Sequence, residues 1–262
     1  MTTTPKALVL RAAGTNCDAE TVRALELAGA SAETLYLGRL LEDPARLEDV
    51  RMLVIPGGFS YGDDIAAGRV FGLELRRALA NELRAHVDRG GLVLGICNGF
   101  QVLVESGLFE PERDAHERTI ALYQNASNQY ECRWVTLQAE DCACSWIVPG
   151  ETTPTPVAHA EGRFVVQDEE TLARLTANRQ IALRYVNPAG GPVDYPLNPN
   201  GAVADIAGIC DPTGRVLGLM PHPERNVAPH HHPRWTRMAA REEGEGLALF
   251  RRMVDAARGA TV

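Results

Sequence analysis

Residues 92–101 read Leu92-Val93-Leu94-Gly95-Ile96-Cys97-Asn98-Gly99-Phe100-Gln101 and place a cysteine between an apolar run and a helical pattern. The apolar run predicts a buried strand, and the residues from Asn98 to Ser106 predict the helix that follows it. Glycines on both sides of Cys97 permit the tight turn that such a connection needs. The stretch therefore predicts a strand–turn–helix unit of an α/β protein.

The same alternation continues on both sides of this unit. Strand-like runs at residues 7–10, 32–37 and 51–55 alternate with helical patterns at 18–28 and 73–89, which predicts an α/β fold with a mostly parallel sheet. Later runs at 132–137, 164–166, 181–185 and 216–219 are joined by turns, so we expect an antiparallel extension of the sheet. A last helix is expected at 243–257. With no linker or repeat in the sequence, one domain is expected over residues 1–262.

Composition limits the possible partners. The chain has 262 residues, of which 45% are apolar and 23% charged, as is usual for a globular protein. Its formal net charge of −8 argues against nucleic acid as a partner, because that function normally needs a basic face. We see no signal-peptide pattern and no apolar stretch near the roughly 20 residues of a membrane helix. A cytoplasmic protein without a membrane or nucleic-acid partner is expected.

The cysteines differ in their local settings. The sequence contains six, but without a secretory signal a disulfide framework is not expected. Cys142 and Cys144 stand close together, yet no second pair has zinc-like spacing, so we expect no metal site. Cys97 is the cysteine whose surroundings indicate chemistry.

Cys97 has the setting of a nucleophile elbow, in which the reactive residue sits between a strand and a helix. The helix dipole and the free N–H groups of the first turn favour the thiolate. The N–H of Asn98 is expected to stabilise the oxyanion that forms when the sulfur attacks a carbonyl. A second glycine turn, Gly57-Gly58-Phe59, is expected to supply another N–H. A buried, inert cysteine is the alternative, which these additional features disfavour.

A thiolate nucleophile is usually paired with a histidine base. His86 lies in a helical pattern and is expected on the surface, and the three histidines at 230–232 are expected to form a solvated loop. His222 follows a predicted strand in the segment Pro221-His222-Pro223-Glu224. Two prolines are expected to keep this segment extended, so that His222 and Glu224 project to the same side. The carboxylate would then fix the histidine tautomer and complete a Cys97–His222–Glu224 triad.

These motifs carry a family resemblance. The elbow at 95–101, the glycine turn at 56–58 and the Pro-His-Pro-Glu segment at 221–224 resemble the class I glutamine amidotransferases. Within that class, the motifs at 57–63, 159–163, 198–201 and 220–225 resemble the glutaminase subunits of phosphoribosylformylglycinamidine synthases. The matching motifs run from Gly14 to Arg225 and so cover most of the chain.

The resemblance implies a flavodoxin-like three-layer αβα sandwich with a mostly parallel central sheet. It also implies that Cys97 attacks the side-chain amide of glutamine, that His222 protonates the departing ammonia, and that water releases glutamate from a thioester. By analogy with the family, Gln101 binds substrate. Gly57, Gly58, Phe59 and Asn98 surround the oxyanion or the substrate.

Partners follow from the same resemblance. Ammonia would pass to a large synthetase subunit, which converts formylglycinamide ribonucleotide to formylglycinamidine ribonucleotide in the fourth step of de novo purine synthesis. A small accessory subunit often accompanies such glutaminases. ATP and Mg²⁺ would belong to the synthetase, and no cofactor is expected in this chain, which has no G-x-x-x-x-G-K loop.

Several loops have less definite roles. The motifs at 159–163 and 198–201 are expected to face the substrate pocket or a partner. Asp63, Asp64 and Arg69 are expected in a loop that contacts the synthetase. Residues 140–149 and 227–237 depart from compact members of the family, and the second of these is expected to be an irregular excursion.

Three other functions are compatible with part of the sequence. The same chemistry could serve a synthetase for GMP, CTP or carbamoyl phosphate, which Asn98 and the 57–63 motif disfavour. A non-enzymatic redox sensor or chaperone could use the cysteine elbow, but it would not need the His222–Glu224 segment. A regulatory subunit that binds glutamine without turnover is the third alternative.

Overall fold

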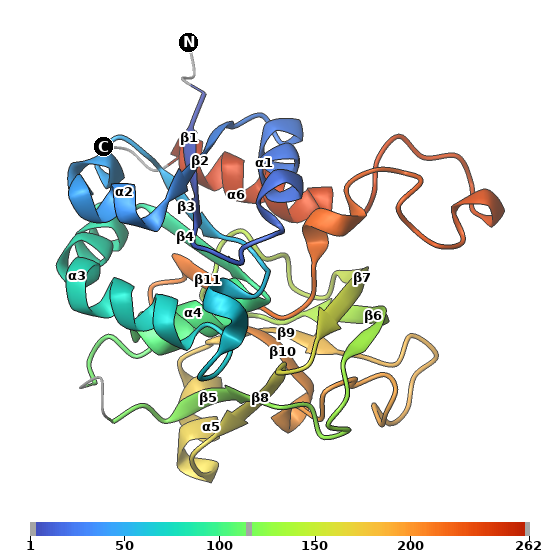
Figure 1. Ribbon diagram of the computed structural model, residues 1–262. Coiled ribbons are helices and arrows are strands. Elements are labelled where there is room, and N and C mark those ends of the chain that lie inside the picture. Colours follow the sequence, from blue (N-terminus) through green and yellow to red (C-terminus); the bar gives the residue numbers. More distant parts are fainter. Residues whose placement is uncertain (1–3, 114–116, 260–262) are drawn as a thin grey trace.

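The centre of the computed structural model, which describes residues 4–113 and 117–259, is a nine-stranded sheet with the order β2-β1-β3-β4-β11-β10-β9-β6-β7 (Figure 1). Its strands are β1 (Lys6–Arg11), β2 (Ser31–Tyr36), β3 (Met52–Ile55), β4 (Leu92–Ile96), β6 (Glu131–Ala139), β7 (Thr152–His159), β9 (Ile181–Tyr185), β10 (Ile206–Cys210) and β11 (Val216–Leu219). A separate antiparallel pair joins β5 (Ile120–Tyr123) to β8 (Arg163–Val166).

Strand direction decides which loops meet. The neighbours from β2 to β11 pair in parallel, and those from β11 to β7 pair antiparallel. Only β10 and β6 therefore run opposite to the other strands of this sheet. The mostly parallel sheet and its antiparallel extension are both confirmed, and the carboxyl ends of β3, β4, β11 and β7 share one edge.

Helices cover both faces of the sheet. They are α1 (Asp18–Leu27), α2 (Leu37–Glu42), α3 (Arg69–Asp88), α4 (Asn98–Ser106), α5 (Glu169–Ala177) and α6 (Leu247–Gly259). Figure 1 shows α1 and α6 on one face and α3 and α4 on the other, which is the expected three-layer arrangement. Every residue of β3, β4, β10 and β11 is buried, as strands covered on both faces require. Among the described residues, no helix is long and apolar enough to cross a membrane.

The sequence pattern located some elements better than others. Strands at 181–185 and 216–219 and the helix at 98–106 have the predicted bounds, whereas the helix expected at 73–89 begins at Arg69. The pattern missed β7, because Pro154 and Pro156 interrupt it. Those prolines are tolerated because β7 is the edge strand and needs hydrogen bonds on one side only.

The surface position predicted for His86 is wrong. Its side chain is fully buried at the end of α3, with Nε2 3.4 Å from the carbonyl oxygen of Leu92 and Nδ1 3.1 Å from Arg89. Burial, followed by the nearby Arg89 charge, lowers the pKa of His86 to about 4. A Cβ on Gly91 would lie 2.4 Å from the ring, so the tight turn after α3 makes room for it.

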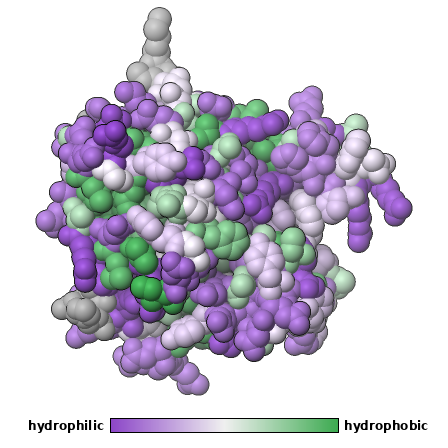
Figure 2. Space-filling model, in the orientation of Figure 1, coloured by the Kyte–Doolittle hydropathy of each residue, from purple (hydrophilic) through white to green (hydrophobic). Residues whose placement is uncertain are grey.

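The predicted excursion at 227–237 is confirmed. Val227 and Ala228 are still buried, whereas residues 229–241 project from the body of the protein (Figure 1) and have as their only regular structure a short 3₁₀ turn at Trp235–Arg237. The projection is largely hydrophilic (Figure 2), although Trp235 is half exposed. The other unusual stretch, at 140–149, packs against the body, where buried Trp146 donates to the carbonyl oxygen of Gly214 at 3.3 Å.

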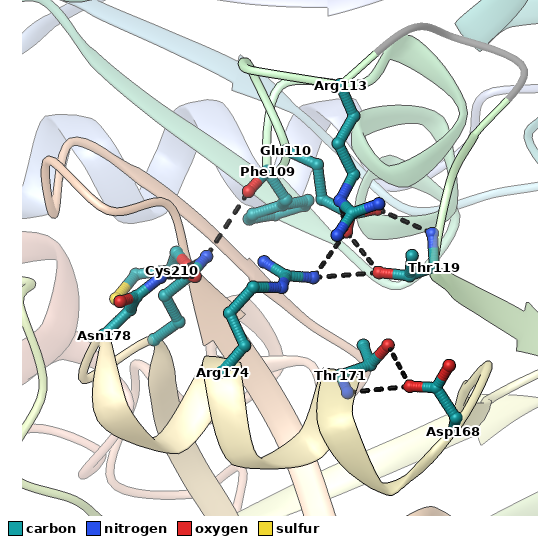
Figure 3. Close-up of polar contacts among 10 residues, drawn as sticks. Phe109, Glu110, Arg113, Thr119, Asp168, Thr171, Arg174, Asn178 and Cys210 are labelled. Atoms are coloured by element: carbon teal, nitrogen blue, oxygen red, sulfur yellow. Dashed lines mark hydrogen bonds and ion pairs between the residues drawn. The ribbon is translucent and has the colours of Figure 1, made fainter.

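A buried carboxylate fixes α5 to the segment after α4 (Figure 3). Glu110 is 3% exposed and accepts hydrogen bonds from Arg174 at 2.6 Å and from the backbone N–H of Thr119 at 3.0 Å. Arg174 also donates to the Thr119 hydroxyl at 2.8 Å. The side chain of Asp168 caps the start of α5 by accepting from the N–H of Thr171 at 2.8 Å. One charged pair thus connects elements that are distant in sequence.

Replacement of Arg174 by Met should lower the free energy of unfolding by about 2 kcal/mol, because it removes the main countercharge of a buried carboxylate. Urea denaturation followed by circular dichroism measures the change. Arg39→Met is the control, since Arg39 and its partner Glu42 are both exposed, and it should cost less than about 0.5 kcal/mol. Equal effects of the two substitutions would contradict the structural role of Glu110.

Candidate active site

The predicted site residues meet at the carboxyl edge of the sheet. Cys97 follows β4, Gly58 follows β3 and His222 follows β11, while β7 brings His159 to the same place. In open α/β sheets this edge is the usual position of binding sites. The register of the β4–β11 pair, with Leu219 opposite Ile96, places the segments that carry Cys97 and His222 side by side.

The backbone of Cys97 is strained in the manner expected of an elbow. Its φ of 52° and ψ of −108° fall outside the regions that L-residues favour. A Cβ on Gly95 would lie 2.6 Å from the carbonyl oxygen of Gly99, and one on Gly99 would lie 1.8 Å from that of Ile55. Both positions therefore exclude any larger residue, and the predicted elbow is confirmed.

His222 and Glu224 form a buried pair. The two side chains are almost completely excluded from solvent, and Nδ1 lies 2.5 Å from a carboxylate oxygen of Glu224. Burial alone would lower the pKa of His222, but the Glu224 carboxylate and the Cys97 sulfur together raise it well above its ordinary value. The carboxylate thus holds a proton on Nδ1. The other ring nitrogen, Nε2, then faces the thiols of Cys97 and Cys17.

The predicted reason for this pairing is wrong in one respect. The segment is not extended, because a 3₁₀ turn begins directly after His222, at Pro223–Asn226. The contact forms because the turn folds Glu224 back toward the ring, while the N–H of His222 is held by the carbonyl oxygen of Pro156 at 2.8 Å. Neighbouring β7 therefore positions the histidine.

Gly57 lets the thiol and the imidazole approach. A Cβ there would lie 2.8 Å from Cε1 of His222 and 3.4 Å from Cβ of Cys97. The Cys97 sulfur is 3.7 Å from the carbonyl oxygen of Ala158, and Nε2 of His222 has no well-aligned hydrogen-bond partner among the described residues. The base is therefore free to exchange a proton with Cys97.

Of the residues expected around the oxyanion, Phe59 cannot donate its N–H. That group already bonds to the carbonyl oxygen of Gly14 at 3.0 Å, which leaves the N–H groups of Gly57, Gly58 and Asn98 as candidates. Gly58 has a φ of +143°, and a Cβ there would lie 2.7 Å from the backbone nitrogen of Asn16. Its conformation thus requires glycine, while Phe59 lines the pocket with its side chain.

A pocket of about 320 Å³ opens beside Cys97. Its walls include Gln101, whose amide nitrogen donates to the carbonyl oxygen of Glu161 at 2.5 Å and whose amide oxygen accepts from Asn98 at 3.0 Å. The complete lining is Gly58, Phe59, Asp63, Ala67, Cys97, Gln101, Ala158, His159, Ala160 and Glu161.

The loops for which the sequence predicted no definite role differ in their position relative to the pocket. His159, Ala160 and Glu161 line the pocket, whereas Asn200 lies behind it and donates to Tyr185 at 3.0 Å and to His159 at 3.5 Å. Asp63 also faces the pocket. Of the other two residues expected to contact a partner, Asp64 is exposed, and Arg69 is paired with Glu105 at 3.8 Å.

Cys17 is the residue at this site to which sequence reasoning gave no role. It approaches His222 from the segment after β1, and Arg225 donates to its sulfur at 3.0 Å. Within the described residues, Cys17, His222 and Glu224 are the one group that could hold a metal ion, with ligand atoms within 4.8 Å of one another. A metal there would have to separate His222 from Glu224. The available signal in the sequence was that the motifs matching the family begin at Gly14, just before Cys17.

Comparisons with known proteins agree with this geometry. Residues 4–255 match the family described as the CobB/CobQ-like glutamine amidotransferase domain. The chain is 45% identical over 226 residues to phosphoribosylformylglycinamidine synthase subunit PurQ of Methanococcus maripaludis, covering 85% of this chain and 83% of the relative. The corresponding subunit of Dehalococcoides mccartyi is 41% identical, with coverage of 97% and 98%.

A solved structure shows the same architecture. The structure of PurLQS from Thermotoga maritima contains a chain with a TM-score of 0.72 and 32% identity to this one. The match covers 97% of this chain and 99% of that chain. The similarity therefore includes the antiparallel half of the sheet as well as the parallel half.

Substitution of Glu224 by Gln should slow alkylation of Cys97 by iodoacetamide about tenfold at pH 7. Loss of the carboxylate lowers the pKa of His222 toward its ordinary value, so less imidazolium is present to stabilise the thiolate. Mass spectrometry of the Cys97 peptide measures the rate. Glu243→Gln, at an exposed ion pair with Arg251, is the control, and an unchanged rate in Glu224→Gln would contradict the paired arrangement.

Proposed function

The chain belongs to the CobB/CobQ-like glutamine amidotransferases and, among them, to the PurQ subunits of phosphoribosylformylglycinamidine synthase, and from this membership we propose how it releases ammonia from glutamine. The observation that carries the mechanism is the strained Cys97 beside the buried His222–Glu224 pair. These residues supply a nucleophile, a base and the group that orients the base. The activity serves purine synthesis as the glutaminase part of the synthase.

The first half of the reaction forms a thioester. The Cys97 sulfur attacks the side-chain carbonyl carbon of glutamine, and the N–H groups of Gly58 and Asn98 stabilise the negative oxygen. His222 then gives a proton to the amide nitrogen, which leaves as ammonia. Glu224 keeps the protonated ring in place throughout, because its carboxylate bonds to Nδ1.

The second half releases glutamate. Nε2 of His222, now without its proton, takes one from a water molecule, and the resulting hydroxide attacks the thioester carbonyl. The same two N–H groups stabilise the second tetrahedral oxyanion. Collapse of this intermediate breaks the carbon–sulfur bond and returns Cys97 to its starting state. Gln101 and Phe59 hold the substrate from the pocket wall, in agreement with their positions beside Cys97.

The partners of this chain follow from its relatives. The Thermotoga maritima assembly is named PurLQS, which supports a large synthetase subunit and a small third subunit as partners here. We assign ATP and Mg²⁺ to the synthetase, no cofactor or metal to this chain, and a cytoplasmic location to the complex. Residues 1–262 would act as one domain, with neither nucleic acid nor membrane as a partner.

Exchange of Cys97 for Ser should abolish formylglycinamidine ribonucleotide synthesis from glutamine by the assembled complex, with a loss of at least about 10³-fold. Synthesis from added ammonium should remain near that of the unmodified complex, because the synthetase site is untouched. Product formation with each nitrogen source measures the two activities. Loss of both activities would mean that Cys97 does not act in glutamine hydrolysis.

The isolated chain should hydrolyse glutamine slowly, and assembly with the synthetase and ATP should raise the rate by about 10²-fold or more. Cys97 is 6% exposed, and a hydrogen bond of 3.1 Å from the N–H of Ala67 to Glu161 joins the two loops over the pocket. Glutamate release by the chain with and without its partner measures the effect. High turnover by the chain alone would contradict control by the partner.

A further inference from the structure

The pocket beside Cys97 has a one-sided charge. Asp63 and Glu161 are the charged residues in its lining, and the described lining includes no lysine or arginine. One wall therefore carries two carboxylates, and no lysine or arginine stands beside them in the described lining of this pocket. Two like charges on one wall raise the free energy of the protein without a ligand. They also attract a cation from solution.

The two carboxylates come from facing loops. Asp63 ends the 3₁₀ turn Ser60–Asp63, which follows β3, and Glu161 lies in the turn between β7 and β8. Asn98 donates to Asp63 at 3.2 Å, and the N–H of Ala67 donates to Glu161 at 3.1 Å. Each hydrogen bond holds one carboxylate oxygen, so both side chains are fixed in position at the pocket.

The same hydrogen bonds connect the carboxylates to the reactive end of the site. The Asn98 amide that bonds to Asp63 also bonds to Gln101, and Gln101 in turn bonds to the backbone of Glu161. Asn98 directly follows Cys97 in the chain. The carboxylates and the nucleophile therefore line one pocket, and a chain of hydrogen bonds connects them.

The electrostatics show that the two carboxylates interact. Burial, followed by the charge of Glu161, raises the pKa of Asp63 to about 6. A positive group between the two residues would remove this repulsion. The free energy lost by placing like charges together in the empty pocket is then recovered when the cation binds.

A buried histidine indicates that the ligand is polar. His159 is 3% exposed and lines the pocket, and its Nδ1 has no partner among the described residues. The backbone N–H of Ala202 donates to Oδ1 of Asn200, so that Nδ2 of Asn200 is the atom that faces Nε2 of His159. Nε2 therefore accepts, and Nδ1 carries the hydrogen. A donor without a partner, next to two carboxylates in a lining that shows no lysine or arginine, suits a ligand with charges of both signs.

We propose that Asp63 and Glu161 together bind the α-ammonium group of glutamine and so make this pocket specific for an amino acid rather than for a simple amide. The assignment rests on the proposed glutaminase function of Cys97 and adds the recognition of the other end of the substrate. An ammonium group fits because it brings a positive charge and three N–H donors to a wall with two carboxylates. A metal ion fits less well, since no third protein ligand joins these two among the described residues.

Glutaramate, which is glutamine without its α-amino group, tests the assignment in the assembled complex. The unmodified complex should prefer glutamine in kcat/KM. Asp63→Asn and Glu161→Gln should each lower kcat/KM for glutamine roughly 30-fold, mainly through KM, because each removes one charge from the ammonium site. With glutaramate, each variant should stay within about threefold of the unmodified complex.

Glu243→Gln is the matched control, because Glu243 is an exposed carboxylate that pairs with Arg251 and lies outside the pocket lining. It should leave both substrates unaffected. Equal losses with glutamine and glutaramate would show that Asp63 and Glu161 only support the loops, and no loss with either would show that the ammonium binds elsewhere. Both results overturn the proposal. Glutamine use that survives Cys97→Ser would instead overturn the glutaminase function itself.

Discussion

The close approach of the turn after β4 to the end of β3 is the constraint on which the site depends. Gly99 lies so near the carbonyl oxygen of Ile55 that a Cβ would be 1.8 Å away, and Cys97 adopts a φ of 52° as a result. Strain of this kind persists only when the surrounding packing holds it in place. Here the buried strands β3, β4 and β11 do so, because their hydrogen bonds determine where each turn begins. The fold thus stabilises a conformation that aims the sulfur at the pocket.

The second half of the sheet supplies what the parallel half lacks. Strand β11 brings the base beside the nucleophile, and β7 holds the backbone of His222 through Pro156. Strand β7 also carries His159 and leads to Glu161, so this edge strand supplies both a support for the base and a wall of the pocket. The antiparallel extension is therefore a part of the site, and its match in the Thermotoga maritima structure agrees with a shared function.

The site contains two kinds of carboxylate, one paired with a histidine and the other facing the pocket. The Glu224 carboxylate is matched to His222, and this pair retains a proton on the imidazole ring. Asp63 and Glu161, by contrast, face a pocket whose described lining contains no lysine or arginine. A matched pair positions a catalytic group, whereas an unmatched pair is suited to a ligand that brings its own charge. The hydrogen bond from the N–H of Ala67 to Glu161 joins two loops that line the pocket.

The sequence by itself determined the α/β class, the elbow at Cys97, the choice of His222 and Glu224, and the family, because glycine spacing and short motifs are local signals. It misplaced His86, missed β7 and gave the wrong backbone for the segment after His222. Only the tertiary structure decided that Phe59 cannot donate its N–H, that Cys17 lies beside the base, and that Asp63 and Glu161 face one pocket. The reason is physical: each of these facts depends on which strand ends are neighbours, and strand order is set by burial and pairing between segments far apart in the chain.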